Sequence, residues 1–435
     1  MANALSVWFD NPNTLPERTK SRLAKTMQPS RILTIAGEVL ALKAQGRQIA
    51  NFTIGDFAPE SFRVPPLFLQ HLHQAQDDGQ TFYPPSVGTH ELRCAIRDYY
   101  HRHLGVDYPT SSVLVGSGAR PLIYSAFACV TDPGDKVVYQ VPSWNTEYYI
   151  ELNECVGERL VATRENKFML TADDLQPHLH DARLIIINSP QNPSGTAISE
   201  DSLRAICLSI VAENHRREQA GDRPLYLLYD MVYWQLTMPG VTHHTPVGLV
   251  PEMSKYTIMV DAISKSWAAT GVRVGWCVAP PWLQGTMAAL VGHMGAWAGR
   301  APQIASANTL KDDTGMATWA ATYREAIGAR LTELHNGFNA MSNAGLPVTP
   351  VPPEGSLYFT AQFDIIGRTH QDQIIETDEH TRSALLHGAG VAVVPFITFG
   401  YPEGSGWMRF SIGAVSSEEI PLALARIRTF LESLK

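Results

Sequence analysis

The chain has little cysteine, and what it has forms no paired motif. Its 435 residues include five cysteines, an odd number, without any C-x-x-C spacing. An odd and scattered set suits neither a disulfide framework nor a zinc site. We therefore interpret the cysteines as reduced side chains of the core. They are Cys94, Cys129, Cys155, Cys207 and Cys277.

Long apolar runs and an excess of positive charge are also lacking. No stretch approaches the ~20 apolar residues that span a bilayer. The N-terminal M-A-N-A-L-S-V-W-F-D has no basic segment followed by an apolar core. Lysine and arginine number 34 against 42 aspartates and glutamates, a net charge of −8 that argues against non-specific nucleic-acid binding. We expect a soluble cytoplasmic protein that binds small molecules, with neither a membrane nor a nucleic acid as partner.

Common metal and phosphate motifs are missing as well. The 15 histidines include close pairs, but most of these are spaced i,i+2 and would point to different faces of a helix. H-E-x-x-H is absent, as are G-x-x-x-x-G-K-[ST] and G-x-G-x-x-G. We therefore expect no metal site. The pairs are His71/His73, His101/His103, His178/His180 and His243/His244.

What the chain does contain is an alternation of strand-like and helical segments. Short β-rich runs are separated by stretches whose apolar residues recur every three or four positions. This alternation predicts an α/β fold with a mostly parallel sheet and helices on both of its faces. The predicted strands are 49–54, 113–115, 136–140, 184–187, 225–229 and 256–260, and the predicted helices are 91–103, 122–130 and one that starts near Ser199.

The two ends of the chain differ from this middle part. Apolar residues of 319–341 recur every three or four positions and predict one long helix that leaves the sheet. Strand-like runs follow at 356–361, 391–394 and 408–412. A last helix should open at Ser416, with Glu419 as its capping-box partner.

The N-terminal segment 15–48 predicts a helical arm interrupted at Pro29, because proline disrupts a helix interior. The expected organisation is a large domain over 51–315 and a smaller α+β domain. The smaller domain should comprise 316–435 together with the arm, 1–50.

A lysine follows one of the predicted buried strands. Lys265 comes shortly after the run 256–260, so the strand should deliver it to an interior cleft. A second β-rich run, 272–278, carries Arg273, and the two cations can converge on one anion. A desolvated lysine has a lowered pKa and can form a Schiff base with a carbonyl. A solvated lysine after a strand is the alternative interpretation, and this motif does not decide between them.

Polar residues follow other predicted strands too. Gly116–Arg120 opens a helix after 113–115, and amides at a helix N-terminus bind phosphate. Asn192 lies in a proline-rich loop after 184–187, and Asp230 and Tyr233 follow 225–229. Ligands of doubly wound sheets bind at the carboxyl ends of the strands. Each signal is weak alone, because glycine-rich helix starts and Asn-Pro turns are common.

Together these residues suit a pyridoxal phosphate site, which needs an imine-forming lysine, a carboxylate for the ring nitrogen and donors for the phosphate. N-S-P-Q-N-P-S-G, Y-D-M-V-Y and S-K-x(7)-R-V-G occur in that order. With them the chain resembles the class I/II aminotransferases of fold type I, and within these the bacterial aspartate aminotransferase branch. The resemblance runs from about Leu23 to Arg409. It implies a mostly parallel seven-stranded sheet flanked by helices, a smaller α+β domain, pyridoxal 5′-phosphate and EC 2.6.1-type chemistry.

The resemblance also implies roles for single residues. Lys265 would be the Schiff-base lysine and the proton carrier, and Asp230 would pair with the ring nitrogen. Tyr233 and Asn192 would hydrogen-bond the ring oxygen. Tyr83 would reach the phosphate of a neighbouring subunit, which implies a homodimer with shared active sites. The other implied cofactor contacts are Gly118, Ala119, Ser264 and Arg273 around the phosphate, Trp144 stacked on the ring, and Arg120.

Substrate binding would fall to Arg409, because a guanidinium can grip an α-carboxylate with two hydrogen bonds. Gly55 would belong to the loop that closes over this carboxylate, and Asn192 and Trp144 would also bind the substrate. Arg120 stands where the branch has a lysine for a distal carboxylate, which favours an acidic amino acid.

An aromatic or neutral donor is also possible, with Trp297 as a candidate lining residue of an apolar pocket. The acceptor would be a 2-oxo acid such as 2-oxoglutarate, and the kinetics ping-pong.

Two alternatives stay open. A lyase or decarboxylase on the same fold would use the same cofactor chemistry, since the protein selects which bond breaks. A non-catalytic binding protein could keep the fold, although the joint presence of Lys265, Asp230 and Arg409 argues against it.

Overall fold

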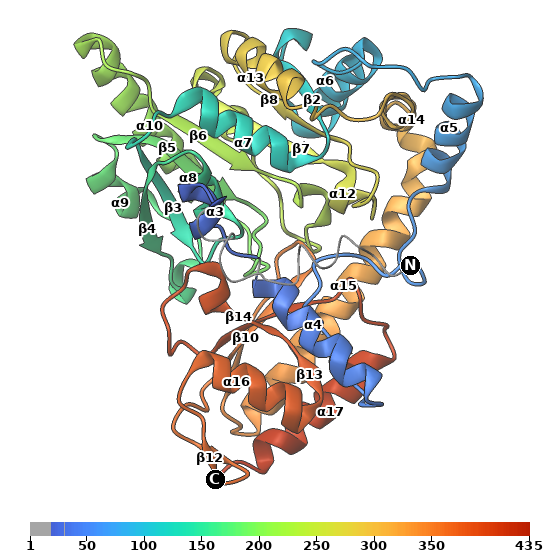
Figure 1. Cartoon of the computed structure of the whole chain (residues 1–435), viewed down its shortest axis with the longest axis vertical. Coiled ribbons are helices and arrows are strands. Elements are labelled where there is room, and N and C mark those ends of the chain that lie inside the picture. Colours follow the sequence, from blue (N-terminus) through green and yellow to red (C-terminus); the bar gives the residue numbers. More distant parts are fainter. Residues whose placement is uncertain (1–18, 30) are drawn as a thin grey trace.

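A seven-stranded sheet forms the centre of the larger part of the molecule. The computed structural model describes residues 19–29 and 31–435. The strand order is β2, β8, β7, β6, β5, β3, β4 (Figure 1). β8 runs antiparallel to both of its neighbours and the other pairs are parallel, which confirms the predicted mostly parallel sheet. The strands are β2 (Val113–Gly116), β3 (Lys136–Val141), β4 (Val156–Val161), β5 (Ala182–Asn188), β6 (Tyr226–Asp230), β7 (Thr257–Ala262) and β8 (Gly275–Val278).

Helices cover both faces of this sheet, as predicted. In β5, Ile185 and Ile187 pack into one core with α6, α10 and α14, whereas Leu184 and Ile186 face a second core with α7, α8 and α13. Because both faces of β5 are buried, its sequence is a nearly continuous apolar run. The helices of this part are α5 (Pro66–Asp77), α6 (His90–Leu104), α7 (Ala119–Val130), α8 (Thr146–Leu152), α9 (Ala172–Leu175), α10 (Glu200–Ala220), α11 (Pro246–Leu249), α12 (Ile263–Ser266), α13 (Pro281–His293) and α14 (Arg300–Leu310).

One long helix joins the two parts of the molecule. α15 (Asp313–Asn343) is capped by Asp312, whose carboxylate accepts a hydrogen bond from the Gly315 amide at 2.8 Å. It descends from the large sheet to the smaller layer (Figure 1). There its buried face, which includes Leu331, Leu334 and Phe338, packs on a four-stranded antiparallel sheet. The prediction of a long helix over 319–341 is confirmed.

The smaller layer is built from short elements. Its four-stranded sheet has the order β14, β15, β10, β9 and shares a core with α17. β1 pairs in parallel with β13, which ties the N-terminal part of the chain to this layer. The elements are β1 (Ala50–Asn51), β9 (Val348–Val351), β10 (Tyr358–Phe363), β11 (Thr369–His370), β12 (Gln373–Ile374), α16 (Asp378–Ala384), β13 (Val391–Ala392), β14 (Val394–Pro395), β15 (Trp407–Ser411) and α17 (Glu419–Glu432).

Some predicted boundaries are wrong. The run 272–278 becomes a strand from Gly275, because Arg273 has a φ of 61° and cannot continue a ladder there. α17 starts at Glu419 after Glu418, with no side-chain cap, so the capping box of Ser416 and Glu419 does not form. The predicted strand 391–394 divides into β13 and β14, and 49–54 shortens to β1.

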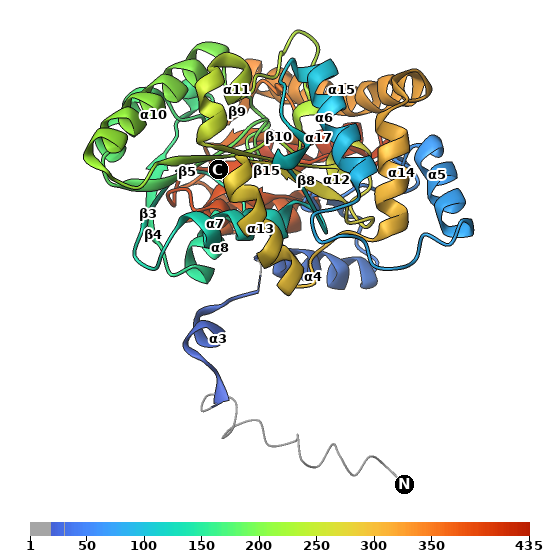
Figure 2. The same cartoon turned by 90° about the horizontal axis from the view of Figure 1, so that it is seen from above.

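The N-terminal arm is helical on either side of Pro29, as predicted. Its helices are α3 (Arg22–Thr26) and α4 (Arg31–Ala44). Figure 2 shows α3 projecting on one side of the main body, to which the ion pair of Arg22 with the Glu154 carboxylate joins it. Residues 15–18 and 30 of the predicted arm lie outside the described residues. No helix in the described ranges is long and apolar enough to cross a bilayer. The expected division into two domains stays a prediction.

Candidate active site

A cavity of about 710 Å³ lies where the carboxyl ends of β5, β6 and β7 meet the smaller layer. This is the size and position expected of a small-molecule site on an α/β sheet. The structure brings most of the predicted site residues together here. The predicted residues in its lining are Gly55, Ala119, Arg120, Trp144, Asn192, Asp230, Tyr233, Ser264, Lys265, Arg273 and Arg409.

Lys265 is held at this cavity by the short helix α12, which follows β7 directly. Its Nζ donates a hydrogen bond to the carbonyl oxygen of Gly55. Its own carbonyl oxygen accepts one from the Tyr323 hydroxyl at 2.6 Å. The first contact joins the lysine to the loop after β1, and the second fixes its main chain against α15.

The surroundings of Lys265 make its amine easier to deprotonate. Burial lowers the pKa of Lys265 to about 8. The Asp56 carboxylate opposes this shift, and the guanidinium groups of Arg409, Arg120 and Arg273 add to it. A neutral amine is the nucleophilic form, so these surroundings suit attack on a carbonyl near neutral pH.

Asp230 ends β6 inside the same cavity. Its Oδ1 accepts a hydrogen bond from the Val232 amide at 3.2 Å. Burial nevertheless raises the pKa of Asp230 to about 6. A cation bound next to this carboxylate would stabilise its charged form. The Asn188 side chain supports the strand end, since its Nδ2 donates to the Asp230 carbonyl oxygen at 2.9 Å.

Two glycines make room for a cationic cradle at the start of α7. A Cβ on Gly118 would lie 2.1 Å from Arg273 Nη2, and one on Gly275 would lie 2.6 Å from the Gly118 carbonyl carbon. Arg273 donates from Nη1 to the Thr270 carbonyl at 2.7 Å and from Nη2 to the Ser117 carbonyl at 3.1 Å. Its guanidinium thus lies beside the N-terminus of α7, an arrangement that suits a phosphate group.

Arg409 lies on β15 and is buried, with 1% of its surface exposed. Its Nη1 donates to Asn192 Oδ1 at 3.0 Å, and its Nη2 donates to the Thr53 carbonyl at 2.6 Å. The guanidinium carbon is 4.6 Å from the ring centre of Tyr358 and 5.0 Å from that of Phe399. Its Nε has no partner among the described residues. An unpaired buried donor at a cavity invites an acceptor from a ligand.

Arg120 offers a second cation to the cavity. Its guanidinium carbon lies 4.3 Å from the ring centre of Trp144, a cation–π contact between two cavity residues. Pro121 follows Arg120 without turning it away, because the first turn of a helix tolerates proline. No ion pair of Arg120 is found within the described residues.

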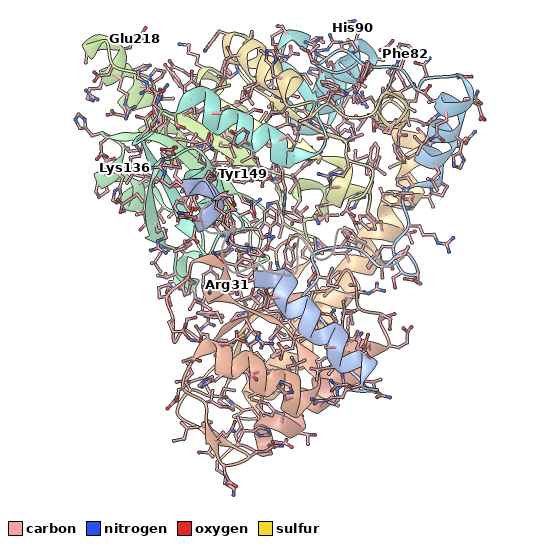
Figure 3. The ribbon with its side chains drawn as sticks, viewed as in Figure 1. Arg31, Phe82, His90, Lys136, Tyr149 and Glu218 are labelled. Carbon is pink, nitrogen blue, oxygen red and sulfur yellow. The ribbon has the colours of Figure 1, made fainter. Side chains whose placement is uncertain are left out.

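Two predicted aromatic residues lie elsewhere. Tyr83 is 82% exposed and meets Trp297 edge to face at 5.7 Å, and neither residue lines the cavity. The suggestion that Trp297 lines an apolar pocket therefore finds no support in this cavity and stays a prediction. Figure 3 labels Phe82, the neighbour of Tyr83, near the upper edge of the molecule and the cavity residue Tyr149 nearer its centre. The contact of Tyr83 with a neighbouring subunit stays a prediction.

The structure adds residues that the sequence analysis missed. The Tyr358 hydroxyl lies 3.1 Å from that of Tyr233, and Asp56 Oδ1 accepts from the Thr270 hydroxyl at 2.6 Å. Tyr358 gave no signal, because an aromatic residue in a strand is ordinary core. Asp56 did give a sequence signal, because it is a polar residue just after the first predicted strand, as Asp230 is after a later strand.

A lysine with a lowered pKa, a buried carboxylate and two arginines with donors to spare can do carbonyl–amine chemistry on a small anionic substrate. This chemistry on an α/β fold indicates an enzyme that uses a lysine for carbonyl–amine chemistry. Residues 47–427 match the family described as "Aminotransferase class I and II". The chain therefore belongs to the class I and II aminotransferase family.

Known relatives agree with this assignment along nearly the whole chain. A probable aspartate/prephenate aminotransferase of Rhizobium leguminosarum is 30% identical over 414 residues, 94% of this chain and 98% of the relative. The aspartate aminotransferase of Rhizobium meliloti strain 1021 is 30% identical over 93% of this chain and 94% of its own length.

A crystal structure of the Rhizobium meliloti aspartate aminotransferase superposes with a TM-score of 0.87 at 27% identity, over 96% of this chain and 99% of that one. The protein transfers an amino group between an amino acid and a 2-oxo acid. This agrees with the predicted fold and class of reaction.

Proposed function

We propose that the amino donor is an acidic amino acid, aspartate or glutamate, and that the acceptor is a 2-oxo acid such as 2-oxoglutarate. The observation that carries this is the placement of two arginines, Arg120 and Arg409, in the cavity that holds Lys265. A substrate with two carboxylates can engage both guanidinium groups, each with a geometry that suits a carboxylate. Relatives named aspartate aminotransferase support the same choice.

We further propose that the cofactor is pyridoxal 5′-phosphate. The cradle of Arg273 at the start of α7 is a suitable phosphate site, and Asp230 is a suitable partner for the ring nitrogen. Tyr233 and Asn192 would donate to the ring oxygen. When bound, this cofactor supplies an electron sink for the negative charge that develops at the substrate α-carbon. The other proposed contacts are Gly118, Ala119 and Ser264 at the phosphate and Trp144 on the ring face.

The protein's own groups would then carry the proton and hold the substrate. Lys265 would accept the substrate's α-proton and deliver it to the C4′ carbon of the cofactor, a transfer that positioned acid–base groups accelerate by typically ~10²–10⁴-fold. Arg409 would bind the α-carboxylate and fix the substrate's orientation, next to the loop at Gly55. Donor and acceptor would use the same groups in turn, so we expect ping-pong kinetics.

The lowered pKa of Lys265 has a measurable consequence in the cofactor-free protein. Capture of added pyridoxal phosphate needs the neutral amine, so its rate should rise with pH and level off above pH 8, because burial lowers this pKa to about 8. The measurement is the rate of appearance of the visible absorbance of the bound cofactor from pH 6 to 10. Lys265→Ala should show no such phase. A rate that keeps rising to the upper end of this range would contradict the altered surroundings of Lys265.

The acidic substrate is tested by Arg120→Leu. Losing a hydrogen-bonded charge pair typically costs about 1.5–3 kcal/mol, so kcat/KM for aspartate should fall roughly 10- to 150-fold. The value for phenylalanine should fall little or rise. Arg368→Leu is the control, because Arg368 is exposed and does not line the cavity. It should change neither value. Equal losses for both amino acids would contradict a role for Arg120 in reading a distal carboxylate.

We also propose that two copies associate so that Tyr83 of each reaches the other's site. Tyr83 is 82% exposed and Phe82 is 59% exposed. Such an exposed aromatic surface supports the presence of a partner that covers it. Arg300 stacks over Phe82 at 4.1 Å on the same surface. A cytoplasmic location stays a prediction.

A further inference from the structure

A fully buried carboxylate lies behind the site, outside the cavity lining. Asp261 on β7 is 0% exposed and receives several hydrogen bonds. Its Oδ2 accepts from Trp234 Nε1 at 2.8 Å and from the Tyr100 hydroxyl at 3.1 Å, and its Oδ1 accepts from the Ala262 amide at 2.7 Å. Trp276 Nε1 donates in turn to the Tyr100 hydroxyl at 2.8 Å. Burying a carboxylate is costly, so this network requires an explanation.

The network joins the two chain segments that carry the site. Trp234 directly follows Tyr233 and opens a one-turn 3-10 helix. Ala262 is the N-cap of α12, the turn that carries Lys265. Asp261 therefore contacts the segment of Tyr233 through the Trp234 indole and the segment of Lys265 through the Ala262 amide.

The ladder between β6 and β7 ends before Asp261, although β7 stays paired with β8 at Asp261 and Ala262. Asp230 and Val260 are the last paired residues of β6 and β7, and the Met231 amide adds one bond to the Val260 carbonyl at 2.9 Å. Asp261 is the next residue along β7, and its side chain points to the opposite face from that of Val260. The contact with Trp234 continues the link between the two strands past the end of their ladder.

We propose that Asp261 is a positioning residue that fixes the Tyr233 hydroxyl relative to Lys265. This rests on the proposed roles of those two residues at the cofactor. Hydrogen bonds to an ionised carboxylate are stronger than neutral ones, which suits a group that must hold a bulky indole. Without that bond Trp234 can move, and Tyr233 moves with it. Small displacements of positioned groups reduce rates strongly.

The test removes the hydrogen bond between Trp234 and Asp261, once by changing its acceptor and once by changing its donor. Asp261→Ala removes the acceptor, and Trp234→Phe removes the donor but keeps an aromatic ring. Thr257→Val is the matched control, because Thr257 begins the same strand, is also 0% exposed and has a hydroxyl without a partner among the described residues. Assays are run at pH 8, above the value of about 7 to which burial raises the pKa of Asp261.

Each of the two variants should lower kcat about tenfold per cofactor-loaded site, the scale of a modest misplacement. KM for aspartate should change less than about twofold, since Arg409 and Arg120 keep their contacts. The double variant should be no slower than Asp261→Ala alone, because the bond that Trp234→Phe removes is already lost in Asp261→Ala. The visible circular dichroism of the bound cofactor should change in the same variants and not in Thr257→Val.

Lower melting temperatures with wild-type kcat and circular dichroism would show that Asp261 supports only the fold, and would overturn the proposal. If the double variant loses kcat by the product of the two single losses, the proposal would be overturned too. If Asp261→Ala does not fold, Trp234→Phe decides alone on the same two readouts. A wild-type protein that transfers no amino group from aspartate or glutamate would instead contradict the proposed substrates, and the circular dichroism comparison would still decide on Asp261.

Discussion

Replacing Lys265 with alanine will abolish transamination. The substitution removes the amine at the centre of the cavity, where burial lowers its pKa to about 8 and Gly55 accepts its hydrogen bond. Loss of the proton carrier alone should reduce kcat by about 10²–10⁴, and loss of covalent capture should reduce it further. The measurement is kcat with aspartate and 2-oxoglutarate in the presence of added pyridoxal phosphate.

The fold of this variant should survive. Burial disfavours the protonated form of Lys265, so its pKa in the folded protein, about 8, lies below the usual value of 10.5. Protein stability linked to this lysine is therefore reduced below about pH 8 and recovers as the pH rises toward 10.5, so alanine should not lower the melting temperature at pH 7. Lys255→Ala, at a surface lysine paired with Glu252, is the control. Substantial remaining turnover in Lys265→Ala would contradict the role of the lysine.

Replacing Asp230 with alanine should weaken both cofactor binding and catalysis. In the proposed function this carboxylate pairs with a cationic ring nitrogen, and burial raises its pKa to about 6 in the protein alone. Breaking a buried pair of this kind costs on the order of 3–5 kcal/mol. This corresponds to roughly 10²–10⁴-fold, divided between the Kd of pyridoxal phosphate and kcat at saturating cofactor.

Both quantities are measurable on one preparation, by absorbance titration with the cofactor followed by steady-state assays. Asp181→Ala removes a surface carboxylate that pairs with Lys136 at 2.6 Å, and should leave both values unchanged. An Asp230→Ala protein with wild-type Kd and kcat would show that Asp230 does not contact the cofactor ring.

The sheet was largely predictable because its strands are buried on both faces. β5, β6 and β7 are continuous apolar runs that end in polar residues, which placed Asp230 and Lys265 at one edge. β4 was missed because it is an edge strand, with Val156 53% and Val161 49% exposed and charged residues between them. β9 was missed because proline interrupts its short apolar run.

The contacts within the site were less predictable, because they depend on tertiary structure. The left-handed backbone of Arg273 follows from its fit against Gly118, which no local pattern indicates. Tyr358 reaches Tyr233 across 125 positions of sequence. Asp261 looked like the end of a strand, and its function as a link to Trp234 becomes visible only when both segments are placed.

The most direct test of the proposed function is the visible absorption spectrum of the purified protein with pyridoxal phosphate, recorded before and after adding aspartate. The proposal predicts a visible band that bleaches with aspartate or glutamate, returns with 2-oxoglutarate, and responds weakly to phenylalanine. A protein that develops no visible band after incubation with the cofactor would contradict it.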